Sequence, residues 1–473
     1  METPKPQKPP KPPPVMIDLP TDRALIYGTP EGLAASKPVA PLVLEAGPQL
    51  FVDDYLIESA QGVTRVVNSP KRDMDGPVID GVNDRTFQPF FTILPSPETG
   101  TFRAWYGAAR DDRSTDGQLL GYMESDDGIR WRRPMRVLAC PPELQFGSDV
   151  LDAGPGCPDP SRRYTWCWCG RDGAHISTSP DGLNFTPISP PNMVPHNHDV
   201  CGLWRDPIRN RYVLTVSDHY YLPHMAQTRR TTSHCFGTDL LNWTRKQIVI
   251  VSDNRYEPDI LQFYAMNGYI ARGGLVIGLV KNLHDDWKTP GCPPDAYGVG
   301  STSLAWTRDG VTWFRDREAF FAPDPQIGAW DHAHAWIDKQ LLLGDQVRFY
   351  YCGYKWGHKV NRFEERQIGL VRMQRDRYVA REAGSAAGTL RTPPLTLKGK
   401  GLTVNAQVDG ELAVRLVDAS GAAVAGCDWA TITGDRVDHP VGWSGRLSAM
   451  AGGPVRLEFR LRAARLFGFD IQA

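Results

Sequence analysis

The sequence predicts an all-β protein, and three observations support this class. The first is a series of short runs that alternate apolar and polar side chains, such as 102–106, 211–216 and 347–351, separated by turns rich in Gly, Pro, Asp and Asn. The second is the near absence of long helical periodicity. The third is a degenerate repeat of a strand, a turn of the Asp-Gly type and an aromatic residue. Together they favour a repeated β architecture.

The repeat occurs in four places and predicts the blades of a propeller. Its copies are 124–131, 178–185, 238–243 and 307–313. An Asp-Gly pair adopts the left-handed geometry of a tight turn, and the aromatic side chain packs the turn against its sheet, so we interpret the motif as structural. With a fifth segment from Trp330 to about Arg377, the repeats predict a five-bladed β-propeller.

The flanking regions differ from the repeats in composition. Residues 1–45 are rich in Pro and poor in aromatic residues, which predicts a disordered, polyproline-like tail. After residue 383 the chain shows small and aliphatic residues in clean alternation, which is typical of a β-sandwich. We therefore expect a tail over 1–45, a propeller that forms the candidate catalytic domain over 46–383, and a β-sandwich domain over 384–473.

Composition excludes several classes of partner. Lys and Arg number 53 against 54 Asp and Glu in 473 residues, so a net charge of -1 offers no global attraction for nucleic acid. No apolar stretch reaches the roughly 20 residues of a membrane-spanning helix, so no membrane partner is expected. The amino-terminal segment lacks the apolar core of a secretory signal, which favours the cytoplasm, or a secreted or periplasmic location if the chain was trimmed. The 9 Cys include no pair of CxxC motifs and are interpreted as buried free thiols.

An acidic residue recurs where the first strand of each predicted blade opens onto the central channel. These residues are Asp84, Asp149, Asp199, Glu257 with Asp259 close by, and Asp331. Carboxylates gathered around one axis raise each other's pKa values at a cost in stability, which indicates a functional site or a bound cation. We expect no cofactor, although a structural calcium ion could occupy the channel; no His spacing predicts a metal site.

Cleavage of a glycosidic bond requires a carboxylic acid and a carboxylate, and this ring could supply both. We predict Glu257 as the general acid, because Tyr256 and Pro258 would partly desolvate it. Asp84 is predicted as nucleophile or base, and Asp199 as the residue that stabilises the transition state or orients the sugar. The residues predicted to bind substrate are Arg85, Asp149, His198, Asp259, Asp331, His332, Lys355 and His358.

Three short motifs resemble the acidic motifs of propeller glycosidases of the glycoside hydrolase family 32 and 43 type. They are Asn83-Asp84, Arg205-Asp206-Pro207 and Glu257-Pro258-Asp259. The opening segment 50–57 and the carboxy-terminal region are also similar to a large bacterial family with a carboxy-terminal β-sandwich. The family 32 resemblance implies Asp84 as nucleophile, Asp206 as stabiliser and Glu257 as acid. We retain Asp199 as the third carboxylate, because the turn after Asp206 repeats the hairpin turn at 158–164 and would place Asp206 at the outer end of its strand.

The sequence thus predicts a glycoside hydrolase that acts on a terminal or small sugar in the central pocket. Two alternatives stay open. One is a non-catalytic propeller that binds carbohydrate or another protein. The other is a lyase or phosphorylase, in which the basic loop 355–366 would bind a uronate or phosphate. Carboxylates that converge to about 5 to 10 Å would favour the hydrolase.

Overall fold

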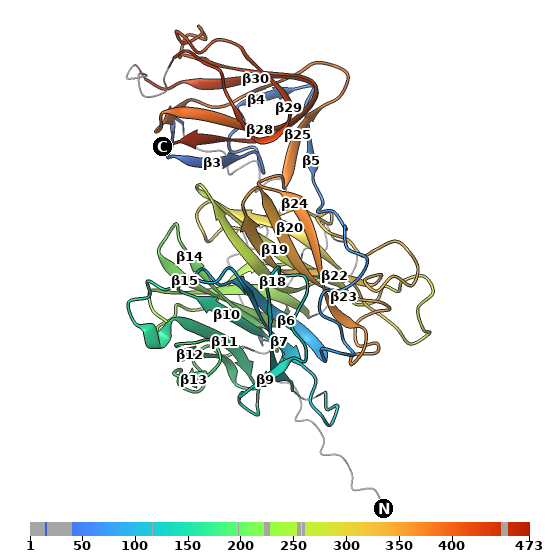
Figure 1. The fold of residues 1–473 in the computed structure, drawn as a ribbon. Helices are drawn as coiled ribbons and strands as arrows, with labels where there is room; N and C mark the ends of the chain where they lie inside the picture. The colour runs from blue at the N-terminus through green and yellow to red at the C-terminus, as the bar shows by residue number, and fades with distance from the viewer. Residues whose placement is uncertain are drawn as a thin grey trace, which may run out of the picture.

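The computed structural model describes residues 15–16, 40–115, 117–196, 198–221, 228–252, 257, 261–445 and 453–473. Within these residues the chain consists of strands and loops, with a single 3-10 turn at Pro160–Arg162. The all-β class predicted from the sequence is confirmed. The strands form two bodies: a large one that contains the middle of the chain, and a smaller one that contains the C-terminus (Figure 1).

The larger body consists of groups of antiparallel strands, which we call blades one to five in chain order. Blade one contains β6 (Thr86–Pro95), β7 (Phe102–Ala108), β8 (Leu119–Ser125) and β9 (Arg136–Leu138). Blade two contains β10 (Ser148–Asp152), β11 (Tyr164–Gly170), β12 (Gly173–Ser179) and β13 (Thr186–Pro187). Blade three contains β14 (Cys201–Asp206), β15 (Arg211–Tyr221), β16 (Arg229–Gly237) and β17 (Gln247–Ile250). Blade four contains β18 (Leu261–Arg272), β19 (Leu275–His284), β20 (Val299–Thr307) and β21 (Phe314–Arg315). Blade five contains β22 (His334–Leu343), β23 (Gln346–Tyr354) and β24 (Arg366–Gln374). The pairing of Gly300 with His334 links β20 to β22, so the strands of blades four and five form one seven-stranded sheet.

The first strands of the blades lie innermost and close into a ring. Strands β6, β10, β14, β18 and β22 contact one another in this order, and β22 returns to β6. The outer edge of blade five is completed by the segment before blade one, where Lys71 and Ile79 bridge to β24. Such closure satisfies strand edges that would otherwise stay unpaired. The propeller architecture predicted from the sequence is confirmed.

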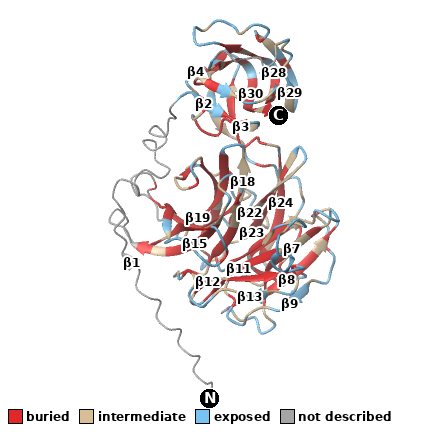
Figure 2. Ribbon diagram, turned by 90° about the vertical axis from the view of Figure 1, so that its left-hand side faces the viewer, coloured by how far each residue is buried: buried red, intermediate tan, exposed pale blue. Residues whose placement is uncertain are grey.

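The Asp-Gly turns join each blade to its neighbour. Gly128 and Gly182 both have φ of 73°, which a side chain would strain, and their carbonyl oxygens lie against the second strand of the preceding blade. Trp105 Nε1 donates to the Gly182 oxygen at 2.7 Å, and the Tyr350 hydroxyl donates to the Gly128 oxygen at 2.9 Å. The aromatic residues of the β strands thus pack between the blades, where buried residues predominate (Figure 2).

The smaller body draws strands from both ends of the described chain. Its strands are β2 (Leu42–Leu44), β3 (Gly47–Leu50), β4 (Ser59–Gln61), β5 (Thr64–Val67), β25 (Val379–Ala383), β26 (Gly388–Arg391), β27 (Leu395–Leu397), β28 (Gly401–Val417), β29 (Ala430–Pro440) and β30 (Arg456–Gln472). The long strand β30 pairs along its length with β28, and along its other edge with β26, β25 and β3. Buried Leu, Val and Phe side chains fill the body.

This pairing differs from the predicted boundaries at residues 46 and 384. Strands β3 to β5 complete the edge of the carboxy-terminal sheet rather than a blade, and β25 pairs with both β5 and β30. The physical reason is that β30 exposes an edge that local strands alone cannot cover. The β-sandwich arrangement of this body stays a prediction.

Part of the predicted tail has described structure. β1 (Val15–Met16) pairs in parallel with the end of β15, and β2 pairs with β27. The other residues before Ala40 lie outside the described residues. In the described part of the chain, no helix is long and apolar enough to cross a membrane.

Candidate functional site at the channel mouth

One end of the propeller gathers side chains from several blades. Neighbouring strands are antiparallel, so the start of a first strand, the end of a second strand and the start of a third strand lie at the same end of a blade. The pairing of Leu261 with His284, and of His334 with Tyr354, illustrates this placement. We call this end of the channel the mouth.

Side chains of blades three and four form one polar network at the mouth, which we call the mouth network. His198 Nε2 lies 3.1 Å from Asp199 Oδ1, and Arg230 Nε donates to the same nitrogen at 3.1 Å. Arg230 also forms an ion pair with Asp285 at 3.3 Å and donates to Gln262, whose amide donates to Asp285. The Asp199 and Asp285 side chains are 30% and 31% exposed. Both carboxylates can therefore meet a solute.

Aromatic rings form the inner wall of the mouth. The Tyr264 ring lies 5.0 Å from the His198 ring, 5.3 Å from the His358 ring and 4.8 Å from the Trp336 ring, which it stacks against. Burial raises the pKa of Tyr264, so its hydroxyl stays protonated. Burial and the charge of Arg366 hold the pKa of His358 well below its usual range, so its imidazole is neutral. The wall thus presents neutral rings toward the mouth network.

An exposed tryptophan follows the mouth network. Trp287 is 46% exposed, and its ring stacks on His284 at 3.8 Å. Asp285 lies between these two residues in the chain, so the tryptophan is carried by the same turn as a mouth carboxylate. A flat, partly exposed aromatic face with a polar neighbour suits the apolar face of a sugar ring.

The structure places the predicted nucleophile Asp84 in a buried ion pair. Arg133 contacts both carboxylate oxygens of Asp84, at 2.8 and 2.6 Å, and the Asp80 backbone N–H donates to one of them. Arg85 has φ of 58° and bonds to Asp111 at 2.7 Å, on a pocket of about 580 Å³ that Phe363 also lines. Both carboxylate oxygens of Asp84 therefore already have hydrogen-bond partners within the protein.

The predicted acid Glu257 also has cations beside it. Arg315 of β21 bonds to its carboxylate, and Arg317 lies 3.7 Å from it. The carboxylate of Glu257 is therefore held by cations of blade four. Asp259 lies outside the described residues.

The other two carboxylates of the predicted ring have separate surroundings. Asp149 lies inside the channel, where it contacts Lys339 of β22 and accepts from Thr92 of β6 at 2.7 Å. Asp331 accepts from Arg72 and from the Tyr351 hydroxyl, both at 2.9 Å. Asp84, Asp149, Glu257 and Asp331 thus each have cations or donors of their own, and Asp199 is the carboxylate of the predicted ring that joins the mouth network.

The remaining predicted residues divide between the mouth and other loops. His198 and His358 line the mouth, as described above. His332 bonds to the Asp324 carbonyl at 2.6 Å in the loop before β22, and Lys355 lies over the Trp356 ring at 5.1 Å.

Asp206, the position that the family 32 resemblance implies, lies at the other end of its strand. It accepts from the backbone N–H groups of Ile208 and Arg209 in the turn after β14.

Sequence reasoning missed Arg230, Asp285 and Trp287. Its search for carboxylates covered the starts of first strands, whereas these residues lie at the start of a third strand and after the end of a second strand. One signal was available: Asp285-Asp286-Trp287 follows the apolar strand 275–284 directly, which places two carboxylates and an aromatic ring at one strand end.

The residues with described structure do not meet the requirements of a metal site. Among the residues with described structure, no group of three or more His, Cys, Asp or Glu side chains is placed to hold a metal ion. All nine cysteines are free, and Cys167, Cys169 and Cys201 are among the buried ones.

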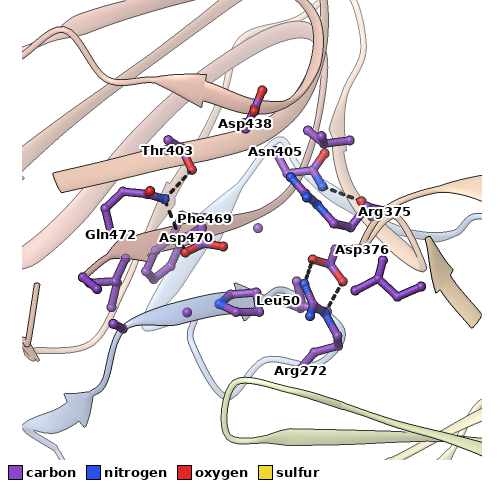
Figure 3. Close-up of a pocket in the computed structure, with 18 residues that line it drawn as sticks. Leu50, Arg272, Arg375, Asp376, Thr403, Asn405, Asp438, Phe469, Asp470 and Gln472 are labelled. Atoms are coloured by element: carbon purple, nitrogen blue, oxygen red, sulfur yellow. Dashed lines mark hydrogen bonds and ion pairs between the residues drawn. The ribbon is translucent and has the colours of Figure 1, made fainter. Parts of the chain in front are cut away.

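A second cavity, of about 610 Å³, lies between the two bodies (Figure 3). Arg272 at the end of β18 forms an ion pair with Asp376 at 2.5 Å on its lower side, and Asp470 of β30 lies across from them. Burial raises the pKa of Asp470, and the charge of Asp376 adds to this effect. Because its charged residues come from both bodies and pair with each other, we interpret the cavity as part of the contact between the bodies.

No family model matches the chain, and no curated protein matches it. Solved structures do resemble it. A glycoside hydrolase shares 12% identity with a TM-score of 0.46, over 65% of this chain and 92% of the other. An N-acetylgalactosamine deacetylase from F. plautii, in complex with blood group B trisaccharide, shares 14% identity with a TM-score of 0.44, over 67% and 96%. A protein of the GH130 family, a family of mannoside phosphorylases that contains hydrolases of β-1,2 mannosidic linkages in Candida mannan, shares 12% identity with a TM-score of 0.43, over 67% and 96%.

Proposed function

We propose that the channel mouth binds and cleaves a glycoside. The observation that supports this is the mouth network, in which Asp199 and Asp285 are both partly exposed and are linked through His198 and Arg230. Glycosidic cleavage needs one carboxyl group that gives a proton to the leaving oxygen and a second that attacks the sugar or activates water. Two carboxyl groups in different surroundings at one opening suit these two tasks.

Asp199 is proposed as the acid because of its contact with His198. A neutral imidazole nitrogen offers one lone pair, and Arg230 donates to Nε2 of His198 at 3.1 Å. Asp199 Oδ1 lies at the same distance from this nitrogen. The described contact of Asp199 is thus with an imidazole, whereas those of Asp285 are with Arg230 and Gln262. A general acid gives its proton to the leaving oxygen and regains one from the attacking water, and a carboxyl group that no guanidinium holds is suited to this task.

Asp285 is proposed as the base or nucleophile. Arg230 and Gln262 both donate to its carboxylate and hold it in place at the mouth. Trp287, two residues further along, would support the sugar ring. Asp84 and Glu257, which the sequence favoured, take structural roles in this proposal because their oxygens contact Arg133 and Arg315.

The test is hydrolysis of a panel of aryl glycosides and oligosaccharides by the wild type and by Asp199→Asn and Asp285→Asn. Each variant should lower kcat by at least about 100-fold on any substrate that the wild type cleaves. Asp126→Asn, which removes an exposed carboxylate from the blade-one turn, serves as the matched control and should keep the full rate.

Two results would contradict the proposal. Full activity in both mouth variants would move the chemistry elsewhere. A wild type that binds glycans, with loss of binding in Trp287→Ala, but cleaves none of the panel would favour the non-catalytic carbohydrate-binding propeller.

A further inference from the structure

We infer that the substrate of the mouth site presents an oxyanion, either as a carboxylate or phosphate group on the sugar or as a free phosphate bound beside it. This inference rests on the proposed function, whose carboxylates it places next to the anion. It names the chemical class of ligand, and it is carried by a group of cations at the mouth, one of which, Arg230, belongs to the mouth network.

These cations come from the loop between β23 and β24 and from β16. Lys359 and Arg362 lie in the loop, Arg366 begins β24, and Arg230 belongs to the mouth network. Arg362 extends over the Phe87 ring at 4.7 Å and the Phe146 ring at 5.6 Å, so aromatic side chains of blades one and two hold it in place. Arg366 is buried against the Tyr354 ring at 4.6 Å, whereas Lys359 is exposed and Arg230 and Arg362 are half-buried, so cations of two blades gather at one opening.

The cations are close enough to repel one another. Burial and the charge of Arg366 lower the pKa of Arg362 to about 10. Burial and the charges of Arg230 and Arg362 lower the pKa of Lys359. Gathering like charges costs free energy that a bound anion would recover. The repulsion between these cations thus raises the free energy of the unliganded mouth, and a bound anion would lower it.

The backbone of this loop is strained at the same place. Lys359 has φ of 70° and Asn361 has φ of 40°, in the left-handed region that non-glycine residues rarely adopt. Strained backbone of this kind tends to occur at binding sites, where it fixes side chains in a set direction. Lys359 is exposed, and within the described chain it has no ion-pair partner. Its ammonium group is therefore available to a ligand.

The local charge contrasts with that of the whole chain. The chain has a net charge of -1, yet the mouth sets Arg230, Lys359, Arg362 and Arg366 against the two carboxylates Asp199 and Asp285. Carboxylates and phosphates share planar pairs of oxygens that guanidinium groups bind through two hydrogen bonds. Both carboxylates act on Lys359 through their charges, so an anion at Lys359 would lie beside the proposed point of cleavage.

Binding to Lys359→Gln tests the inference, because this exposed side chain can change without loss of the fold. Calorimetric titrations would use glucuronate, glucose and inorganic phosphate with the wild type, Lys359→Gln and Lys359→Arg. Arg130→Gln, which removes an equally cationic and highly exposed side chain from a blade-one turn, is the matched control. We expect at least one of the two anions to bind at least 10-fold more tightly than glucose, and Lys359→Gln to lose that preference while Lys359→Arg and Arg130→Gln keep it.

The two anions distinguish the two sources. Tighter binding of glucuronate would show that the oxyanion belongs to the sugar. Tighter binding of inorganic phosphate, together with release of a glycosyl phosphate from a neutral glycoside, would show that the oxyanion is a free phosphate. Equal binding of glucose and both anions, or an unchanged preference in Lys359→Gln, would overturn the inference. If the inference failed but Asp199→Asn still abolished cleavage, the proposed function would stand. If anions bound as expected but Asp199→Asn and Asp285→Asn both kept full activity, the proposed function would fail and the anion site would stand.

Discussion

Acidic residues at equivalent sequence positions have different surroundings in this protein. Asp84, Asp149, Glu257 and Asp331 each contact an arginine or a lysine and have little exposure. Asp199 contacts a histidine instead and keeps part of its side chain in solvent. A buried carboxylate with a cation partner is fixed by that ion pair, whereas a partly exposed carboxylate beside an imidazole stays accessible to a solute. Function at the residue scale therefore depends on the partner rather than on the position in the repeat.

Buried histidines predict that acid destabilises the protein. Burial and the charge of Arg211 lower the pKa of His234 to about 3, and burial with neighbouring cations lowers those of His334 and His358. In the unfolded chain a histidine has a pKa of about 6.5, so below this pH the unfolded state binds more protons than the folded state. Each such histidine should remove about 1.4 kcal/mol of unfolding free energy per pH unit below pH 6.5.

Urea unfolding at pH 7.5 and 5.5 measures this effect. The wild type should lose stability at the lower pH, and His358→Gln should lose less between the two values, because one titrating ring is gone. Only the change with pH is compared, since the substitution itself alters packing at both values. Equal losses in the two proteins would show that His358 does not contribute.

At the scale of elements, the Asp-Gly turns connect blades as well as strands. The turn of blade two lies against Trp105 of blade one, and the turn of blade four lies against Arg211 of blade three, whose side chain donates to the Gly310 oxygen at 2.7 Å. Repetition of the turn thus repeats an interblade contact. The sequence interpretation of the motif as structural agrees with this placement.

Gly182→Ala should therefore destabilise the propeller more than Gly154→Ala does. Both glycines have positive φ, 73° and 79°, so both substitutions strain the backbone by about 1 to 2 kcal/mol. A Cβ at Gly182 would also lie 3.1 Å from the Trp105 and Tyr164 rings, whereas a Cβ at Gly154 meets nothing within 4 Å. The added crowding should cost about 1 to 3 kcal/mol. Chemical denaturation of the two variants measures the difference, and equal values would mean that the neighbouring blade yields freely.

At the scale of the whole molecule, the two bodies meet at the hairpin of β18 and β19. Gly273, at this turn, approaches the Pro48 carbonyl of β3, and Arg272 beside it pairs with Asp376 (Figure 3). The close approach needs a residue without a side chain. The hairpin of β22 and β23 has Gly344 in the same conformation but faces open space.

Gly273→Ala should loosen the contact between the bodies, and Gly344→Ala should not. The φ values are 59° and 60°, so the backbone strain is matched, but a Cβ at Gly273 would lie 2.2 Å from the Pro48 oxygen. Calorimetric unfolding combined with limited proteolysis around residues 68–78 and 375–379 reports the effect. We expect a lower Tm and faster cleavage in Gly273→Ala than in Gly344→Ala. The same behaviour in both variants would mean that strain in the hairpin, not the contact, matters.

The sequence by itself determined the class of fold, because strand alternation and Asp-Gly turn geometry are local properties that each repeat carries in full. It also predicted His198 and Asp199 at the channel mouth, since the start of a first strand has a defined position in a blade, and His358 in a loop expected to cover the mouth. Only the tertiary structure decided which carboxylates share a network and which bind a cation. Arg230 and Asp285 join the network of Asp199 through His198, from strands that the sequence does not place together. Strand β3 covers an edge of β30, a strand some 400 residues later. Such contacts depend on chain closure, which no local pattern encodes.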